Sequence, residues 1–195
     1  MTSLPPLPDP SLRADALLVV RCRLGEDAAW AELVAIWQPR LWRYFLGMFG
    51  RADDAEDALQ SAWLRIVRSF GGLREPGLLG PWMYGVARRT AQDRLRRSFG
   101  ADRAAERLSD AEDAGGATDD DSAFRLEFRE EVLTALAGLS PDDREWVVLH
   151  YLEARSITEI AALCAVPLGT VKSRLHRSRR RLRRRLASLI RTEPS

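Results

Sequence analysis

The sequence contains few of the residues from which metal sites and catalytic centres are built. Its 195 residues include two cysteines and two histidines. Cys22 and Cys164 lie far apart, without the CxxC pair or His-Cys cluster of a zinc site. A glycine-rich phosphate loop is also absent, and His150 and His176 do not supply a nucleophile with a paired base. We therefore expect no metal, no cofactor and no enzymatic activity, and we expect both thiols to be reduced and buried.

Long hydrophobic runs and strand-like alternation are missing as well. Nowhere do about eighteen apolar residues follow one another, as a membrane span requires. The opening stretch, MTSLPPLPDPS, has neither the basic nor the apolar region of a signal peptide. These absences predict a cytoplasmic protein without membrane insertion. Apolar residues do not recur with the two-residue period of a strand over any useful length, so the fold should be all-α.

Charge is distributed unevenly, although the net charge is only +2. Residues 100–121 carry eight acidic and two basic side chains, a net charge of minus six. This stretch, rich in Ala, Gly and Asp, is typical of a flexible linker. The sequence therefore predicts two small helical domains, at residues 12–98 and 123–191, joined by an acidic linker at 99–122.

The most informative stretch, residues 156–186, predicts a helix-turn-helix. Ser156 followed three positions later by Glu159 is the signature of a capping box, which begins a short helix. Pro167, with its fixed φ and missing N–H, suits the first turn of the helix that follows. That second helix has one apolar stripe at the helical period, which we expect to pack inward. The stripe consists of Val171, Leu175, Ser178, Leu182 and Leu186.

The rest of this second helix is strongly basic. Positions 172–185 hold nine Lys or Arg residues and no acid, a density that repels itself unless an anion neutralises it. A helix-turn-helix places its second helix in the major groove of DNA, where side chains contact base edges and phosphates. The alternative is a basic helix that only faces solvent, but such a helix needs no capped helix and turn before it. The predicted DNA contacts are Thr170, Lys172, Ser173, Arg174, His176, Arg177 and Arg180.

A second amphipathic helix is predicted within residues 51–70. Acidic residues crowd its first turn, where the helix dipole favours negative charge, and one apolar stripe should be buried. Asp57, Gln60, Ser61 and Leu64 share another face, which combines acidic and apolar groups. This face suits a partner protein, although a well-capped surface helix would have the same spacing.

A third helix is predicted to begin at Pro81 and to expose a basic surface. Five arginines between positions 88 and 97 stand against one acid, Asp93. Trp82 and Tyr84 lie at the start of this helix. Basic residues beside aromatic side chains suit a nucleic-acid strand with unstacked bases, because every base has a face that can stack. Taken alone, this pattern has low specificity.

Together, the motifs resemble those of the extracytoplasmic-function (ECF) sigma factors, a group within the sigma-70 family. DDAEDALQSAW at 53–63 resembles the conserved helix of region two, and PWMYGVARRTAQDRLRR at 81–97 resembles its promoter-melting and minus-ten-reading helix. VPLGTVKSRLHRSRRRL at 166–182 is similar to the DNA-binding segment of region four. The resemblance covers about residues 14–188, apart from the linker. It implies a subunit that binds core RNA polymerase, directs it to promoters and helps to open the duplex.

The resemblance also implies roles for individual residues. Contact with the clamp helices of the polymerase beta-prime subunit is implied for Asp54, Asp57, Gln60, Ser61 and Leu64. Binding of the minus-ten element is implied for Trp82, Tyr84, Arg88, Arg89, Arg96 and Arg97. The DNA contacts of the helix-turn-helix would then be contacts with the minus-thirty-five element. The beta flap of the polymerase and an anti-sigma factor are further partners that the family suggests.

Several positions depart from the family's pattern. Arg89 stands where Asn is common, Gly85 where a larger residue is usual, and Ser61 where Glu is common. Ala165 occupies a turn position where Gly is frequent, and a positive φ there would cost about 1 kcal/mol. The alternative function is a stand-alone helix-turn-helix regulator, whose N-terminal sensory domain would not need the helices at 53–63 and 81–97.

Overall fold

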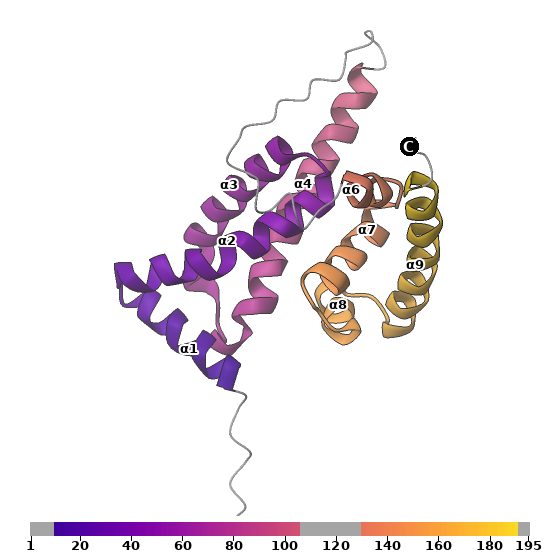
Figure 1. Cartoon of the computed structure of the whole chain (residues 1–195). Coiled ribbons are helices and arrows are strands. Elements are labelled where there is room, and N and C mark those ends of the chain that lie inside the picture. The colour runs from indigo at the N-terminus through magenta and orange to yellow at the C-terminus, as the bar shows by residue number, and fades with distance from the viewer. Residues whose placement is uncertain (1–9, 106–129, 191–195) are drawn as a thin grey trace, which may run out of the picture.

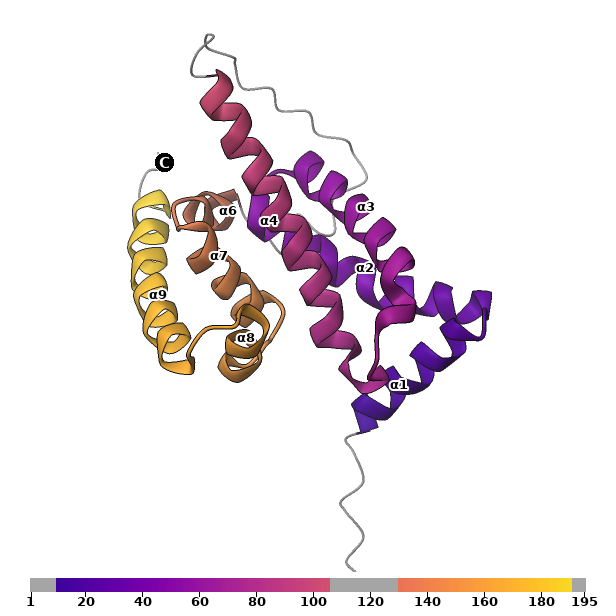
Figure 2. The ribbon, with the colours of Figure 1, turned by 180° about the vertical axis from the view of Figure 1, so that it is seen from behind.

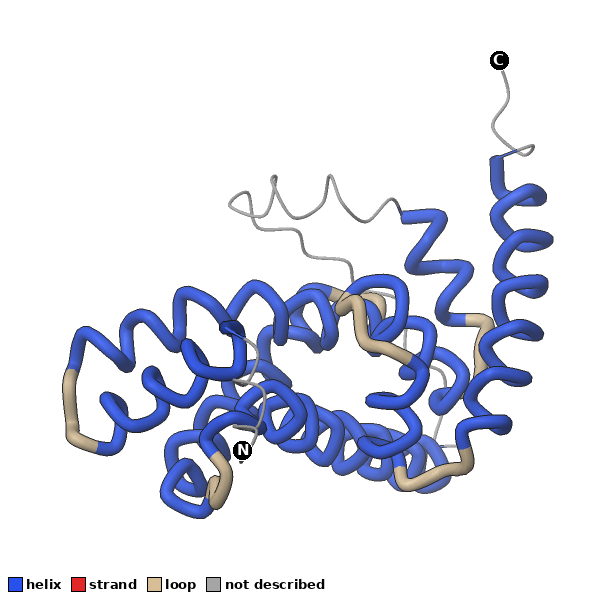
Figure 3. The backbone as a smooth tube through the Cα atoms, turned by 90° about the horizontal axis from the view of Figure 1, so that it is seen from below, coloured by secondary structure: helices blue, strands red, loops and turns tan. Residues whose placement is uncertain are grey.

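The computed structural model describes residues 10–105 and 130–190. Every regular element in these two ranges is a helix, which confirms the predicted all-α fold (Figure 3). Most of the predicted linker, from residue 106 to 122, and the first residues of the predicted second domain lie outside the described residues.

The N-terminal half is built from four α-helices. They are α1 (Pro10–Arg23), α2 (Asp27–Phe49), α3 (Ala52–Ser69) and α4 (Leu79–Ala105), with short 3-10 turns at Phe70–Gly72 and Pro76–Leu78. Gly25 and Gly50 follow α1 and α2 with φ of 80° and 76°, a left-handed conformation that glycine adopts without steric cost. Pro39 lies inside α2, and the helix continues through it.

Helix α4 is longer than the sequence predicted. It runs seven residues past the expected domain boundary at residue 98, to Ala105. The added stretch, FGADRAA, contains three alanines and an arginine, which are among the best helix formers. The helix also continues through Gly100, a poor helix former, and so extends into the segment whose composition is typical of a linker.

The C-terminal half contains the predicted helix-turn-helix. Its elements are α6 (Glu130–Ala137), α7 (Pro141–Val147), a π-helical turn (Val148–Leu152), α8 (Ile157–Cys164) and α9 (Leu168–Ile190). The predicted capping box begins α8: the Glu159 N–H donates to Ser156 Oγ at 3.2 Å, and the Ser156 N–H donates to Glu159 Oε2 at 2.8 Å. Ala165 follows α8 with a φ of 54°, so this turn position does require a positive φ.

The two halves pack against each other. The C-terminal helices lie alongside α2 and α4 in opposite views (Figures 1 and 2), and the buried apolar residues of both halves form one continuous cluster. At one close approach, a Cβ atom added to Gly47 of α2 would lie 2.7 Å from Cγ2 of Val148. A helical stripe indicates that a face is buried but not which distant element covers it, so this packing was not predictable from spacing.

Candidate nucleic-acid interface

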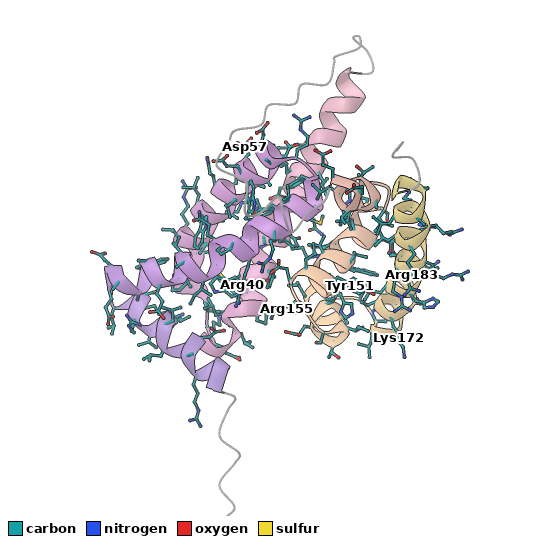
Figure 4. The ribbon with its side chains drawn as sticks, in the orientation of Figure 1. Arg40, Asp57, Tyr151, Arg155, Lys172 and Arg183 are labelled. Carbon is teal, nitrogen blue, oxygen red and sulfur yellow. The ribbon has the colours of Figure 1, made fainter. Side chains whose placement is uncertain are left out.

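The basic face of α9 points away from the rest of the molecule. Val171, Leu175 and Ser178 are buried, as the stripe predicted. The exposed polar residues of the predicted DNA contacts are Lys172, Ser173, His176, Arg177 and Arg180, while Thr170 is half-buried. Figure 4 labels Lys172 and Arg183 on α9, the helix of the C-terminal half that lies farthest from the N-terminal half. This face is therefore open to a large anionic partner.

Arg174 is the member of the predicted set that the structure places differently. Its Nε lies 2.7 Å from Asp143 Oδ1 and its guanidinium carbon lies 4.7 Å from the centre of the Trp146 ring. A second carboxylate, that of Asp142, is 3.8 Å away. Within the described residues, the ion pairs of α9 are those of Arg174. Arg174 therefore attaches α9 to α7, and its side chain points into the domain because the aromatic ring and the two acids lie there.

The partner-like face of α3 is exposed. The side chain of Asp57 is 66% exposed, Gln60 is exposed, and Ser61 is half-buried. Leu64 and Val67 are 58% and 60% exposed, so two large apolar side chains face solvent beside the acid. The sequence prediction omitted Val67, although its position three residues after Leu64 would have placed it on this face.

Ion pairs in both directions connect α3 and α4. Arg94 NH2 lies 2.6 Å from Asp54 Oδ1 and 3.3 Å from Asp57 Oδ2. Arg65 NH1 lies 2.7 Å from Asp93 Oδ2 in the opposite direction, from α3 to α4. Hydrogen bonds from Arg65 and Arg96 lower the pKa of Asp93, and the hydrogen bond to Asp54 raises the pKa of Arg94. The predicted protein-binding and DNA-binding helices are thus joined by charge pairs.

Three of the predicted minus-ten residues lie on the open side of α4. Arg89, Arg96 and Arg97 are exposed. Arg96 pairs with Asp93, and Arg97 Nε donates to the Asp93 carbonyl at 3.3 Å. These surface contacts on the same helix are weak enough for a phosphate to replace them.

The other three predicted minus-ten residues, Trp82, Tyr84 and Arg88, are partly or fully buried. Trp82 is half-buried and packs edge-on against Phe70 at 5.8 Å between ring centres. Tyr84 is 1% exposed, and its hydroxyl donates a hydrogen bond to Glu153 of the C-terminal half. Arg88 is half-buried, with Nε 3.1 Å from Glu145 Oε2. In this structure Tyr84 and Arg88 face the second half of the protein, contrary to the expectation that both are available to DNA.

Two buried carboxylates complete this arrangement. Glu145 is 3% exposed and also accepts a hydrogen bond from the Tyr44 hydroxyl at 2.8 Å. Glu153 is 5% exposed and lies 3.3 Å from Arg43 Nε. Burial raises the pKa of both carboxyls, although their arginine and tyrosine partners act in the opposite direction. Sequence reasoning missed both residues, and the only signal was that Glu145 stands next to an apolar run, WVVL.

Comparison with known proteins assigns both halves. Residues 33–98 match the family model for sigma-70 region 2, and residues 129–182 match that for sigma-70 region 4. The RNA polymerase sigma factor CarQ of Myxococcus xanthus is 36% identical over 170 residues, which cover 87% of this chain and 95% of CarQ. The chain belongs to the sigma-70 family. The ECF sigma factor SigW of Bacillus subtilis is 27% identical over 88% of this chain and 96% of its own length, so the chain is a sigma factor of the ECF group.

Solved structures have the same fold as this sigma factor. The sigma factor RpoE of Bartonella quintana, solved with the anti-sigma factor NepR, aligns with a TM-score of 0.66 at 22% identity, over 81% of this chain and 96% of RpoE. CnrH, solved with the cytosolic domain of CnrY, aligns with a TM-score of 0.64 at 20% identity, over 93% and 99% of the two chains. At these identities the likeness supports the helical architecture alone.

The described part of this sigma factor holds no cluster of three or more metal-ligating side chains. No helix in the described ranges is long and apolar enough to cross a membrane. The two cysteines are buried and unpaired. Burial raises the pKa of Cys164 to about 11, so its thiol is protonated at neutral pH.

Proposed function

We propose that this sigma factor binds core RNA polymerase through the exposed face of α3. Asp57, Gln60 and Leu64, with Val67 beside them, offer a carboxylate next to an apolar strip. Such a mixed surface suits a basic, amphipathic helical partner, and the family resemblance points to the clamp helices of the beta-prime subunit. Asp54 and Ser61 lie at the edge of this surface. Asp54 would act mainly by fixing Arg94.

We further propose that α9 binds the minus-thirty-five element. Lys172, Ser173, His176 and Arg177 lie in the first half of α9, on its open face, where a recognition helix meets base edges. Arg180 and Thr170 would contact phosphates at the two ends of this patch. Arg174 would support the patch from behind, because its guanidinium is held by Asp143 and Trp146.

The minus-ten element would be bound by α4 and by the loop before it. Arg89, Arg96 and Arg97 offer cations, and Trp82 offers a partly exposed ring. Tyr84 and Arg88 would join them when the C-terminal half moves away. Holding a base outside the duplex by stacking and its strand by cations is a general means of reading melted DNA.

A groove in the C-terminal half supports a second polymerase contact. It has a volume of about 230 Å³ and lies between α6, the π-helical turn and α9. Its lining is almost entirely apolar and includes Val132, Leu136, Val147, Leu152, Leu182 and Leu186. We propose that an apolar helix of the polymerase, the beta flap, docks here. An anti-sigma factor would regulate the protein by covering one of these surfaces.

The proposed activity is promoter-specific initiation without a catalytic step of the protein's own, in the cytoplasm where core polymerase works. The observation that carries it is the presence, in one chain, of an exposed acidic-apolar α3 face and an exposed basic α9 face. Run-off transcription with core polymerase and this chain alone tests it: a sigma factor initiates without any other specificity subunit. A requirement for a second sigma factor would favour the stand-alone regulator instead.

A further inference from the structure

The C-terminal part of α9 carries a second group of arginines, apart from the proposed DNA contacts. Arg181, Arg184 and Arg185 line a pocket of about 460 Å³ together with Gly138 and Ser188. The pocket lies where the end of α9 runs beside α6 and the turn that follows α6 (Figures 1 and 2). Its volume is within the range of small-molecule sites in proteins. None of these five residues belongs to the proposed DNA or polymerase surfaces.

The pocket opens on a different side of α9 from the DNA-facing residues. Successive residues of an α-helix are rotated by about 100°, so Arg185, nine residues after His176, projects about 180° away from it. Arg181 projects about 140° away from His176, and Arg184, at about 80°, lies at the border between the two sides. A helix with its side chains is about 10–12 Å wide, which exceeds the Debye length of about 8 Å at physiological ionic strength. A duplex on the His176 side therefore leaves Arg185 without a counter-charge.

Arg185 reaches from α9 to the turn after α6 and forms one wall of the pocket. Its guanidinium lies where a side chain at position 138 would begin, since a Cβ atom added to Gly138 would overlap NH1 and Cζ of Arg185. The carbonyl groups at the end of α6 do not explain this position. Arg144 donates to the carbonyls of Leu136 and Ala137 at 3.0 and 2.7 Å, so the end of α6 has a cation of its own.

The three arginines of the pocket are not neutralised by the part of the chain that the structure describes. Arg174, two turns before Arg181 on the same side of α9, pairs with two acids, Asp142 and Asp143. Within residues 10–105 and 130–190, no carboxylate lies at ion-pair distance from Arg181, Arg184 or Arg185. Like charges around one pocket repel one another unless an anion lies between them. The protein thus holds three guanidinium groups where one anion can contact all of them.

We propose that this pocket binds a small anion with two or three linked phosphate groups, such as inorganic tripolyphosphate or the phosphate chain of a nucleotide. A guanidinium forms two parallel hydrogen bonds to phosphate oxygens, so three arginines match a chain of phosphates better than one tetrahedral anion. Among the described residues, those that line the pocket include no apolar or aromatic side chain. A base or an apolar peptide side chain would find no surface to pack on, so the phosphates are the part that is recognised.

Isothermal titration calorimetry of the full chain with tripolyphosphate tests the proposal, at constant ionic strength and without divalent cations. We expect one bound anion per chain. Sulfate should bind more weakly, because a single tetrahedral anion pairs with fewer of the three arginines. ATP should bind about as tightly as tripolyphosphate, since its base and sugar gain no contact. This comparison distinguishes free polyphosphate from a nucleotide as the source of the phosphate chain.

Arg185→Ala should weaken tripolyphosphate binding by about tenfold or more, the loss expected for a charge-assisted hydrogen bond. Arg185→Lys keeps the charge but not the planar donor fork, so its affinity should be intermediate. Arg183→Ala is the matched control: it removes one arginine from the same helix, on the side that lines the apolar groove. Its affinity for tripolyphosphate should equal that of the wild type. Arg185 is exposed, so its variants should fold, which circular dichroism verifies.

A comparison with DNA binding separates this site from the proposed minus-thirty-five interface. Arg177→Ala should retain tripolyphosphate binding and lose affinity for promoter duplex, whereas Arg185→Ala should lose tripolyphosphate binding and retain the duplex. If Arg177→Ala leaves duplex binding unchanged while Arg185→Ala still loses tripolyphosphate, the DNA assignment fails and the anion site stands. The reverse failure leaves the DNA assignment intact.

Several results would overturn the anion site. One is equal tripolyphosphate affinity in the wild-type and Arg185→Ala proteins, and another is a loss in Arg183→Ala or Arg177→Ala as large as that in Arg185→Ala. Complete displacement of tripolyphosphate by promoter duplex would place Arg181 and Arg185 in the DNA interface instead. Binding of ATP without binding of tripolyphosphate would contradict recognition of the phosphates alone.

Discussion

The hydroxyl of Tyr44 in α2 donates a hydrogen bond to Glu145 in α7 across 2.8 Å, and both side chains are buried. The two residues are 101 positions apart in the sequence. Their contact joins the half that matches sigma-70 region 2 to the half that matches region 4. The relative position of the halves thus depends on a few buried polar residues as well as on apolar packing.

Stability should depend on pH through the buried glutamates. Burial raises the pKa of Glu145 and Glu153 above the ordinary value of 4.5, so the folded protein binds protons more tightly than the unfolded chain. Their contribution is fully present below that value and is lost as pH rises through the raised pKa. We expect the free energy of unfolding, measured by urea denaturation, to fall as pH rises from 4.5.

Glu145→Gln provides the comparison for this pH effect, because glutamine does not titrate. The charged and titratable groups around Glu145 are Arg88, Tyr44, Asp142 and Cys164, and they remain in the variant. The decline of stability with pH should be shallower in Glu145→Gln. An equally steep decline would show that other groups cause it.

Arg174→Ala should destabilise the protein by about 1–3 kcal/mol. The substitution removes a stacking contact with Trp146 and leaves the largely buried carboxylate of Asp143 without its ion-pair partner. Urea denaturation measures the loss. A change within about 0.5 kcal/mol, typical of a surface residue, would mean that Arg174 is not structural.

Arg177→Ala should weaken DNA binding without destabilising the protein. Arg177 is exposed on the same helix, so its loss should leave the unfolding free energy within about 0.5 kcal/mol of the wild-type value. Binding to promoter DNA should weaken, and the slope of log affinity against log salt should become shallower by about one. Fluorescence titrations at several salt concentrations measure both quantities. An unchanged slope would remove Arg177 from the proposed interface.

Asp57→Ala with Gln60→Ala should impair capture of core polymerase without unfolding the protein. Both side chains are exposed on α3, so the unfolding midpoint should stay near that of the wild type. Pull-down with purified core polymerase measures the effect. Glu56→Ala is the control, since Glu56 is an exposed acid in the same turn on another face of the helix. If the Asp57→Ala, Gln60→Ala protein captured as much core polymerase as the Glu56→Ala protein, this face of α3 would not be the polymerase-binding surface.

Ala165→Gly should stabilise the helix-turn-helix by about 1 kcal/mol. Ala165 is exposed and has a φ of 54°, where glycine avoids the clash of a Cβ atom with the backbone. Ala162→Gly is the matched control: Ala162 is exposed inside α8, so glycine there should destabilise by about 1 kcal/mol. Thermal denaturation measures both changes in stability. If the two variants were both stabilised or both destabilised, the backbone argument would be contradicted.

The sequence predicted the features that local chemistry determines. The capping box at Ser156 and the buried positions Val171, Leu175 and Ser178 of α9 each follow from residues a few positions apart. It did not predict that Arg174 turns inward, because its partners Asp143 and Trp146 are about thirty residues away. The pairing of Tyr84 with Glu153 was likewise hidden, since helical periodicity contains no information about which helices meet.

Transcription in vitro on fragmented genomic DNA of the source organism, with sequencing of transcript 5′ ends, tests the central claim most directly. The account predicts start sites that appear only when the chain is added to core polymerase and that share sequence elements near minus ten and minus thirty-five. These starts should be lost with the Asp57→Ala, Gln60→Ala protein. No starts beyond those of core polymerase alone would contradict the account.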